Sequence, residues 1–196
     1  MLIFEDKLRG TKAPYAAIDE AIRIVQFIRN KALRLWMDTR GTNGYDLNVA
    51  CSQLAKAFPF ASKLNSQARQ AAAERAWAAI SRFYANCKTH KPGKKGYPRF
   101  QHDNRSVEYK QTGWKLEPDG KHITFTDGCN IGRLRLVGSK NQRIDEFPVK
   151  KSFLSSKLSV FALLNAQMAP MLSSLLMQKD GLNMFLLAKM PVSTWV

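Results

Sequence analysis

Cysteine is scarce in this chain. Three cysteines occur in 196 residues, Cys51, Cys87 and Cys129, and no two of them form a Cys-x-x-Cys pair. A disulfide framework needs an even set of cysteines, and a structural zinc site needs closely spaced ligands. We therefore expect free thiols, no cysteine-based zinc site and a cytoplasmic location, where thiols stay reduced.

Motifs of catalysis, metal binding and export are also missing. The chain contains no Gly-x-x-x-x-Gly-Lys-[Ser/Thr] loop, no Gly-x-Ser-x-Gly turn and no His-Glu-x-x-His motif. His90 and His102 have no third ligand near them in the sequence, which predicts no metal site. The N-terminus carries Glu5 and Asp6 where an export signal requires positive charge. We expect no catalytic residue, no cofactor, no metal and no small-molecule substrate.

Acidic residues are few compared with basic ones. The chain has 31 lysines and arginines against 15 aspartates and glutamates, which gives a formal net charge of +16. Such a surplus is typical of proteins that bind a polyanion, most often nucleic acid and less often an acidic membrane surface. Hydrophobic residues are 45% and charged residues 23%, as in folded domains, which excludes wholesale disorder.

The apolar pattern divides the chain into four regions. Residues 1–13 hold one strand. Residues 14–87 are helical by their three- and four-residue apolar spacing, with helices over about 14–36, 47–57 and 65–87. Residues 88–151 begin as a basic loop and continue as strands over 106–110, 113–116, 122–126 and 132–137, with Asp-Gly turns between some of them. Residues 152–196 are a tail rich in Leu, Met and Ser. This order predicts an α+β fold: an N-terminal helical bundle, a small incomplete antiparallel β-barrel, then an irregular or helical apolar tail.

Cations and aromatic residues alternate at the start of the third region. Lysine and arginine neutralise phosphates, and aromatic rings stack on unpaired bases. Our candidate nucleic-acid-binding residues are Lys88, Lys91, Lys94, Lys95, Tyr97, Arg99, Phe100, Arg105, Lys110, Trp114 and Lys115. The alternative is a solvated loop whose rings anchor it to the body of the protein. A second set of cations lies on the polar side of the first helix, where solubility is an equal explanation: Arg23, Arg29, Lys31 and Arg34.

Several segments resemble the OrfB/TnpB-type proteins encoded by transposons. Residues 27–33, Phe-Ile-Arg-Asn-Lys-Ala-Leu, resemble the Phe-Val-Tyr-Asn-x-Ala-Leu element of that family, and residues 64–68 resemble the start of its long helix. Residues 94–100, Lys-Lys-Gly-Tyr-Pro-Arg-Phe, resemble its Gly-[Phe/Tyr]-Pro-[Arg/Lys]-Phe signature. The strands over 113–116 and 131–136 resemble those that follow in the family. The resemblance covers about residues 17–137.

The resemblance implies a transposase-type protein that is related to the type V CRISPR nucleases and cleaves DNA under RNA guidance. Such proteins have a barrel interrupted by a helical domain, and these two parts bind guide RNA and target DNA. The resemblance therefore implies that residues 1–13 supply the first barrel strand. A nuclease core with three acidic residues and a divalent metal follows, with a zinc ribbon inserted late. Neither a Gly-Ile-Asp-x-Gly element nor a Cys-x-x-Cys ribbon occurs in these 196 residues. We therefore expect a truncated transposase that keeps the nucleic-acid-binding region and lacks the nuclease.

The tail departs from the family. The family would continue with a Lys-Arg-Ala-Asp-Gly turn, two strands and an Ile-Asp-Val-Gly element, whereas residues 152–196 include ten leucines and five methionines. Codons read in a shifted frame permit the missing turn at 164–172 and the missing element at 189–196. We therefore expect a frameshifted tail that does not pack as a proper element and leaves the barrel incomplete.

Two other interpretations of the chain remain open. It could be an independent basic accessory protein that binds RNA or DNA, with a C-terminal helix for a partner. It could also be a small membrane-associated protein, because residues 158–178 carry no charge and are long enough to span a bilayer. Polar residues inside that stretch lower its hydropathy, so a membrane partner is the less favoured interpretation.

Overall fold

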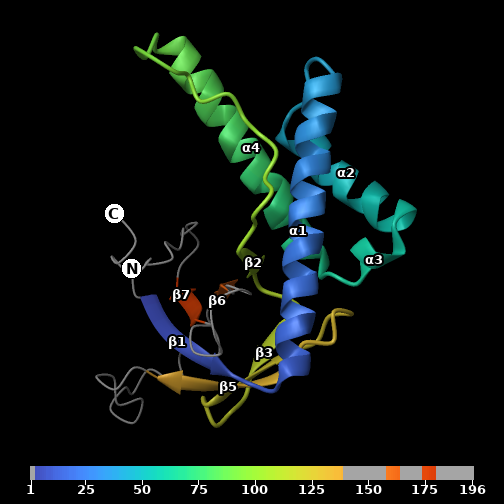
Figure 1. The fold of residues 1–196 in the computed structure, drawn as a ribbon, viewed down its shortest axis with the longest axis vertical. Coiled ribbons are helices and arrows are strands. Elements are labelled where there is room, and N and C mark those ends of the chain that lie inside the picture. Colours follow the sequence, from blue (N-terminus) through green and yellow to red (C-terminus); the bar gives the residue numbers. More distant parts are fainter. Residues whose placement is uncertain (1–2, 139–157, 164–173, 180–196) are drawn as a thin grey trace, which may run out of the picture.

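The computed structural model describes residues 3–138, 158–163 and 174–179 (Figure 1). In these residues one strand is followed by four helices and then by six more strands. The elements in chain order are β1 (Ile3–Arg9), α1 (Lys12–Asp38), α2 (Gly44–Ala57), α3 (Pro59–Ser62), α4 (Ser66–Lys88), β2 (Ser106–Tyr109), β3 (Trp114–Leu116), β4 (His122–Phe125), β5 (Gly132–Gly138), β6 (Leu158–Leu163) and β7 (Ser174–Lys179). The predicted α+β class is confirmed. The helices and strands predicted within residues 3–138 are all present, with small differences at their ends.

The two long helices pack against each other through apolar stripes. α1 buries residues at three- and four-residue spacing, among them Ile18, Val25 and Ile28. α4 presents a row of buried alanines, of which Ala72 and Ala76 are at most 1% exposed. Because alanine extends little beyond the backbone, this row lets the two helices approach closely.

The strands form one sheet with the order β2-β6-β7-β1-β5-β4-β3, and all neighbours are antiparallel. Leu8, Ile123 and Leu134 are buried and extend the helical core into the sheet. The outermost strands, β2 and β3, do not pair with each other within the described residues. Within the described residues the sheet is therefore not closed, in agreement with the prediction that no complete barrel forms.

The tail differs from the prediction in two places. Leu158–Leu163 and Ser174–Lys179 are strands, not helical or irregular chain. β6 pairs with β2 and β7, and β7 also pairs with β1, so these segments lie inside the sheet. The sequence signal failed because neither segment alternates apolar and polar residues, whereas pairing in a sheet depends on the backbone N–H and C=O groups, which every such residue carries. The other tail residues lie outside the described ones.

The interpretation of residues 158–178 as a membrane helix is also wrong, because strands are observed where it requires a helix. Both ends of that stretch are strands paired in the sheet. Among the helices in the described part of the chain, none combines the length and apolarity that crossing a bilayer requires.

Candidate nucleic-acid interface

Residues 89–105, which we call the return segment, run back from the end of α4 along α1 to β2 (Figure 1). Asn30 of α1 holds the middle of this segment. Its Nδ2 donates to the Gln101 carbonyl at 2.8 Å, and its Oδ1 accepts the Gln101 N–H at 2.9 Å. Closer to β2, Gln26 Oε1 accepts the Asn104 N–H at 3.0 Å. These contacts fix a segment without helix or strand along one face of α1.

Aromatic rings join the far end of the return segment to α1 and α4. Between ring centroids, Trp36 lies 5.9 Å from Tyr84 and 5.7 Å from Tyr97. Phe83 meets Tyr97 edge-on at 5.2 Å, and Trp36 Nε1 donates to the Tyr84 hydroxyl at 3.0 Å. Tyr97 nevertheless stays 54% exposed. It therefore both anchors the segment and offers ring surface to a ligand, so the two interpretations of the aromatic residues are compatible for Tyr97.

Most cations predicted for the loop lie at the surface. Lys88, Lys91, Lys94 and Arg99 are exposed, and none of them makes an ion pair with another described residue. Lys95 is half-buried, and its ammonium donates to the Lys91 carbonyl. The surface cations lack a carboxylate that would compete for them, so they can neutralise phosphates.

Other predicted residues already have partners in the protein. Arg105 pairs with Asp103 at 2.6 Å, and Lys110 pairs with Glu74 of α4 at 2.6 Å. Trp114 is half-buried, and its Nε1 donates to the Lys110 carbonyl at 2.9 Å. These contacts place Lys110 and Trp114 in the packing between α4 and the sheet.

An open hollow of about 420 Å³ lies on α1 beside the return segment. The hollow is lined by Arg23, Gln26, Phe27, Asn30, Lys31, Arg34 and Phe100. Its cations and Phe100 are among the residues predicted from the sequence, whereas Gln26, Phe27 and Asn30 were not predicted as site residues. Their spacing was a usable signal, because positions 23, 27, 30, 31 and 34 recur on one face of a helix.

Lys115 belongs to a different surface, the outer face of the sheet. Because Leu8 and Leu136 are buried, their neighbours Lys7, Arg9 and Arg135 lie on the opposite, exposed face. Arg9 is the direct cross-strand partner of Arg135. Like charges opposite each other destabilise a sheet, so this pair makes no favourable contribution to the fold.

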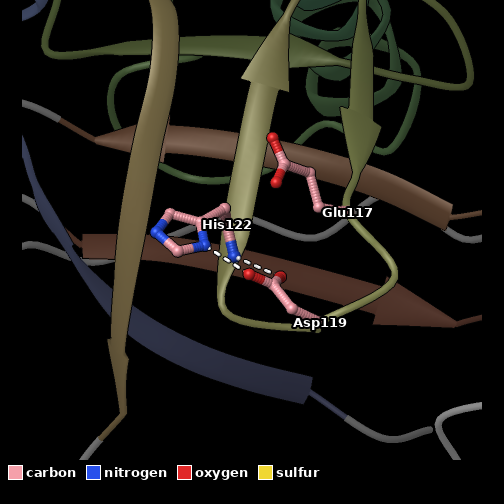
Figure 2. Close-up of side chains that lie close together, drawn as sticks. All are labelled: Glu117, Asp119 and His122. Atoms are coloured by element: carbon pink, nitrogen blue, oxygen red, sulfur yellow. Dashed lines mark hydrogen bonds and ion pairs between the residues drawn. The ribbon is translucent and has the colours of Figure 1, made fainter.

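The turn between β3 and β4 gathers Glu117, Asp119 and His122, whose candidate ligand atoms lie within 4.8 Å of one another (Figure 2). Asp119 Oδ2 lies 2.5 Å from His122 Nδ1, and Glu117 accepts two hydrogen bonds from Arg133 at 2.8 and 2.6 Å. The Arg133 hydrogen bonds lower the pKa of Glu117, and the His122 hydrogen bond lowers the pKa of Asp119. These atoms are of the kind that binds divalent metals, but each carboxylate already has a protein partner. We assign the group to the stability of the turn.

The three cysteines are free thiols, and burial makes two of them unreactive as nucleophiles. Burial raises the pKa of Cys51 to about 11 and that of Cys129 to about 12. Both side chains are therefore protonated thiols at neutral pH, and a thiol is a poor nucleophile compared with its thiolate.

No protein-family model matches this chain, and no curated protein matches it either. A function is therefore argued from the charges, rings and contacts of the described residues.

Proposed function

We propose that this chain binds nucleic acid through the return segment and the exposed face of α1. The observation that carries the proposal is the attachment of a basic, aromatic segment to a cationic helix face by Asn30. Exposed cations on both elements neutralise phosphates, and exposed rings offer surfaces to unpaired bases. A net charge of +16 supports the same class of partner.

The chain corresponds, in this proposal, to the nucleic-acid-binding region of a TnpB-like transposon protein, acting in the cytoplasm. Residues 27–33 and 94–100 carry the resemblance. Asn30 in the first of these segments hydrogen-bonds Gln101, next to the second, which gives the resembling residues a joint structural role.

An independent basic accessory protein is the second candidate. The observation that favours it is the insertion of β6 and β7 between β2 and β1, which makes part of the tail a component of the sheet. The nucleotide sequence separates the two candidates. Restoring one base should open an in-frame nuclease after residue 151 if the tail is frameshifted, and should open none if the accessory protein is genuine.

The full chain is expected to bind a structured RNA hairpin more tightly than duplex DNA of equal length, because unpaired bases are available for stacking. Replacing Lys94, Lys95 and Arg99 with alanine should weaken RNA binding by about tenfold or more at moderate salt, because phosphate contacts are lost. Each lost contact should also reduce the slope of the logarithm of the binding constant against the logarithm of the salt concentration by about one. Fluorescence anisotropy across a salt series measures both quantities.

A control variant with the same charge change is available elsewhere on the surface. Lys12, Lys56 and Lys121 are exposed and lie outside both the return segment and the hollow. Their triple alanine variant should keep most of the affinity. Equal losses in the two triple variants would mean that net charge alone attracts RNA and that the return segment is not the binding surface.

The chain alone is expected to cleave neither RNA nor DNA in the presence of Mg²⁺ or Mn²⁺. Two-metal cleavage requires carboxylates that hold the ions, and the acidic motifs of the resembled family do not occur in these residues. Incubation with a labelled target and a matched guide, followed by gel electrophoresis, tests this. Guided cleavage by the purified chain would contradict the binding-only function.

A further inference from the structure

The α1 hollow combines cations, amide groups and aromatic rings within one helix face. Arg23, Lys31 and Arg34 are exposed cations of its lining, and no carboxylate of the described residues lines it. Arg34 does pair with Asp38 at 2.8 Å, but both side chains are more than half exposed, so water and salt screen that pair strongly. The hollow therefore favours an anion.

The aromatic residue Phe27, which lines the hollow, is packed against two other rings. Phe27 lies 5.1 Å from Phe58 and 5.0 Å from Phe60 in edge-to-face contacts. Lys31 Nζ lies 5.7 Å from the Phe27 ring centroid, which keeps the cation near the floor of the hollow. Phe100, from the return segment, is 38% exposed and gives the hollow a ring surface from a second element.

The side-chain amide of Gln26 is oriented by a hydrogen bond to the return segment. Its Oε1 accepts the Asn104 N–H, so its amide nitrogen is the opposite terminal atom. That nitrogen has no hydrogen-bond partner among the described residues, although Gln26 lines the hollow. An NH₂ group in this position can donate to a carbonyl oxygen or ring nitrogen of a base.

The length over which the cations extend, rather than the volume of the hollow, decides between a free nucleotide and a strand. The volume of about 420 Å³ lies within the range of sites that hold small ligands, and it suits one base with its sugar. The cations, however, extend from position 23 to position 34, which is about 16 Å along a helix that rises 1.5 Å per residue. Cations spread over that length address successive phosphates of a chain, not the phosphate of one nucleotide.

We propose that the α1 hollow binds one unstacked base of a single-stranded nucleic acid, with Phe100 as its stacking surface and the α1 cations on the flanking phosphates. A base inside a duplex is covered on both faces, so only a splayed base can enter. This inference rests on the proposed function and assigns it a preference for unpaired strands.

The test uses the full chain and short single-stranded oligouridylate and oligothymidylate probes, each with one central 2-aminopurine, whose fluorescence falls on stacking. We expect quenching on binding, and about tenfold weaker binding by Phe100→Leu, since stacking of a base on an aromatic ring is worth a factor of this order. Leucine keeps an apolar side chain but has no ring face. The salt dependence of the variant should match that of the unmodified chain, because no cation is removed.

Tyr45→Leu is the matched control. Tyr45 is 75% exposed on α2 and does not line the hollow. This variant should bind and quench like the unmodified chain. If the unmodified chain binds the probes but Phe100→Leu binds equally well and quenches equally, no base occupies the hollow, and the broader proposal survives. If the unmodified chain binds neither these probes nor the RNA hairpin at low salt, both proposals fail.

Discussion

Replacing Arg75 with alanine is expected to lower the free energy of unfolding by about 3 kcal/mol, which is a large effect for a single substitution. Arg75 of α4 lies 3.5 Å from Glu108 of β2, and it also donates to the carbonyl and hydroxyl oxygens of Ser106. Glu108 is 8% exposed. Without the guanidinium, its carboxylate remains buried with no ion-pair partner among the described residues, which is the costly outcome.

The pH dependence of this loss identifies its cause. Burial raises the pKa of Glu108 above its ordinary value, and the nearby charge of Arg75 opposes that rise. In the Arg75→Ala variant the pKa of Glu108 should rise further. Because the pKa of Glu108 is higher in the folded state than in the unfolded state, protonation of this carboxyl favours the folded state. Its contribution to the free energy of unfolding is therefore fully present below the unfolded-state pKa of about 4.3, and it is lost as the pH rises through the folded-state pKa. The difference between variant and unmodified chain should therefore shrink from pH 7 to pH 4.

Urea denaturation at several pH values measures this difference. Arg82→Ala is the matched control, because Arg82 is exposed on the same helix about two turns further on. It should change stability by less than about 0.5 kcal/mol. Adding Glu108→Gln to Arg75→Ala should recover part of the loss, since a neutral amide costs less to bury. A loss that does not depend on pH, or that Glu108→Gln does not relieve, would attribute the effect of Arg75 to its packing and its Ser106 contacts alone.

Replacing Asn30 with alanine is expected to weaken RNA binding by about tenfold and to lower the free energy of unfolding by about 2 kcal/mol. The substitution removes both hydrogen bonds to Gln101, whose N–H and carbonyl lose partners in a half-buried position. The return segment then samples other conformations, and ordering it again on binding reduces affinity. Anisotropy measures the binding, and hydrogen exchange at the Gln101 amide measures the local opening.

Asn30→Asp and Gln70→Ala sharpen this test. Aspartate keeps one acceptor for the Gln101 N–H but places a second oxygen against the Gln101 carbonyl, so it should be no better than alanine. Gln70 is an exposed amide on α4, and its replacement should leave stability and binding unchanged. Slow exchange of the Gln101 amide and full RNA affinity in Asn30→Ala would show that the return segment is held by other contacts.

The difference between predicted and observed site residues has a physical origin. Composition revealed the basic segment, because charge and aromatic content are properties of a residue type. Whether a given cation is available depends on its neighbours in space: Lys110 is paired with Glu74, which is 36 positions away in the sequence, whereas Lys94 makes no ion pair among the described residues. No local pattern distinguishes these two lysines.

The sequence by itself determined α1, α2 and α4, the strands from β1 to β5 and the cationic character of the chain, whereas the short helix α3 was not predicted. Apolar periodicity and the Asp-Gly turns act over a few residues, so they can be recognised locally. Tertiary structure alone decided the rest. Asn30 meets Gln101 across 71 positions, and β6 and β7 enter the sheet although their residues do not alternate. Backbone groups at a sheet edge and along an unpaired loop must find hydrogen-bond partners, and which partners they find depends on what the packed helices bring near.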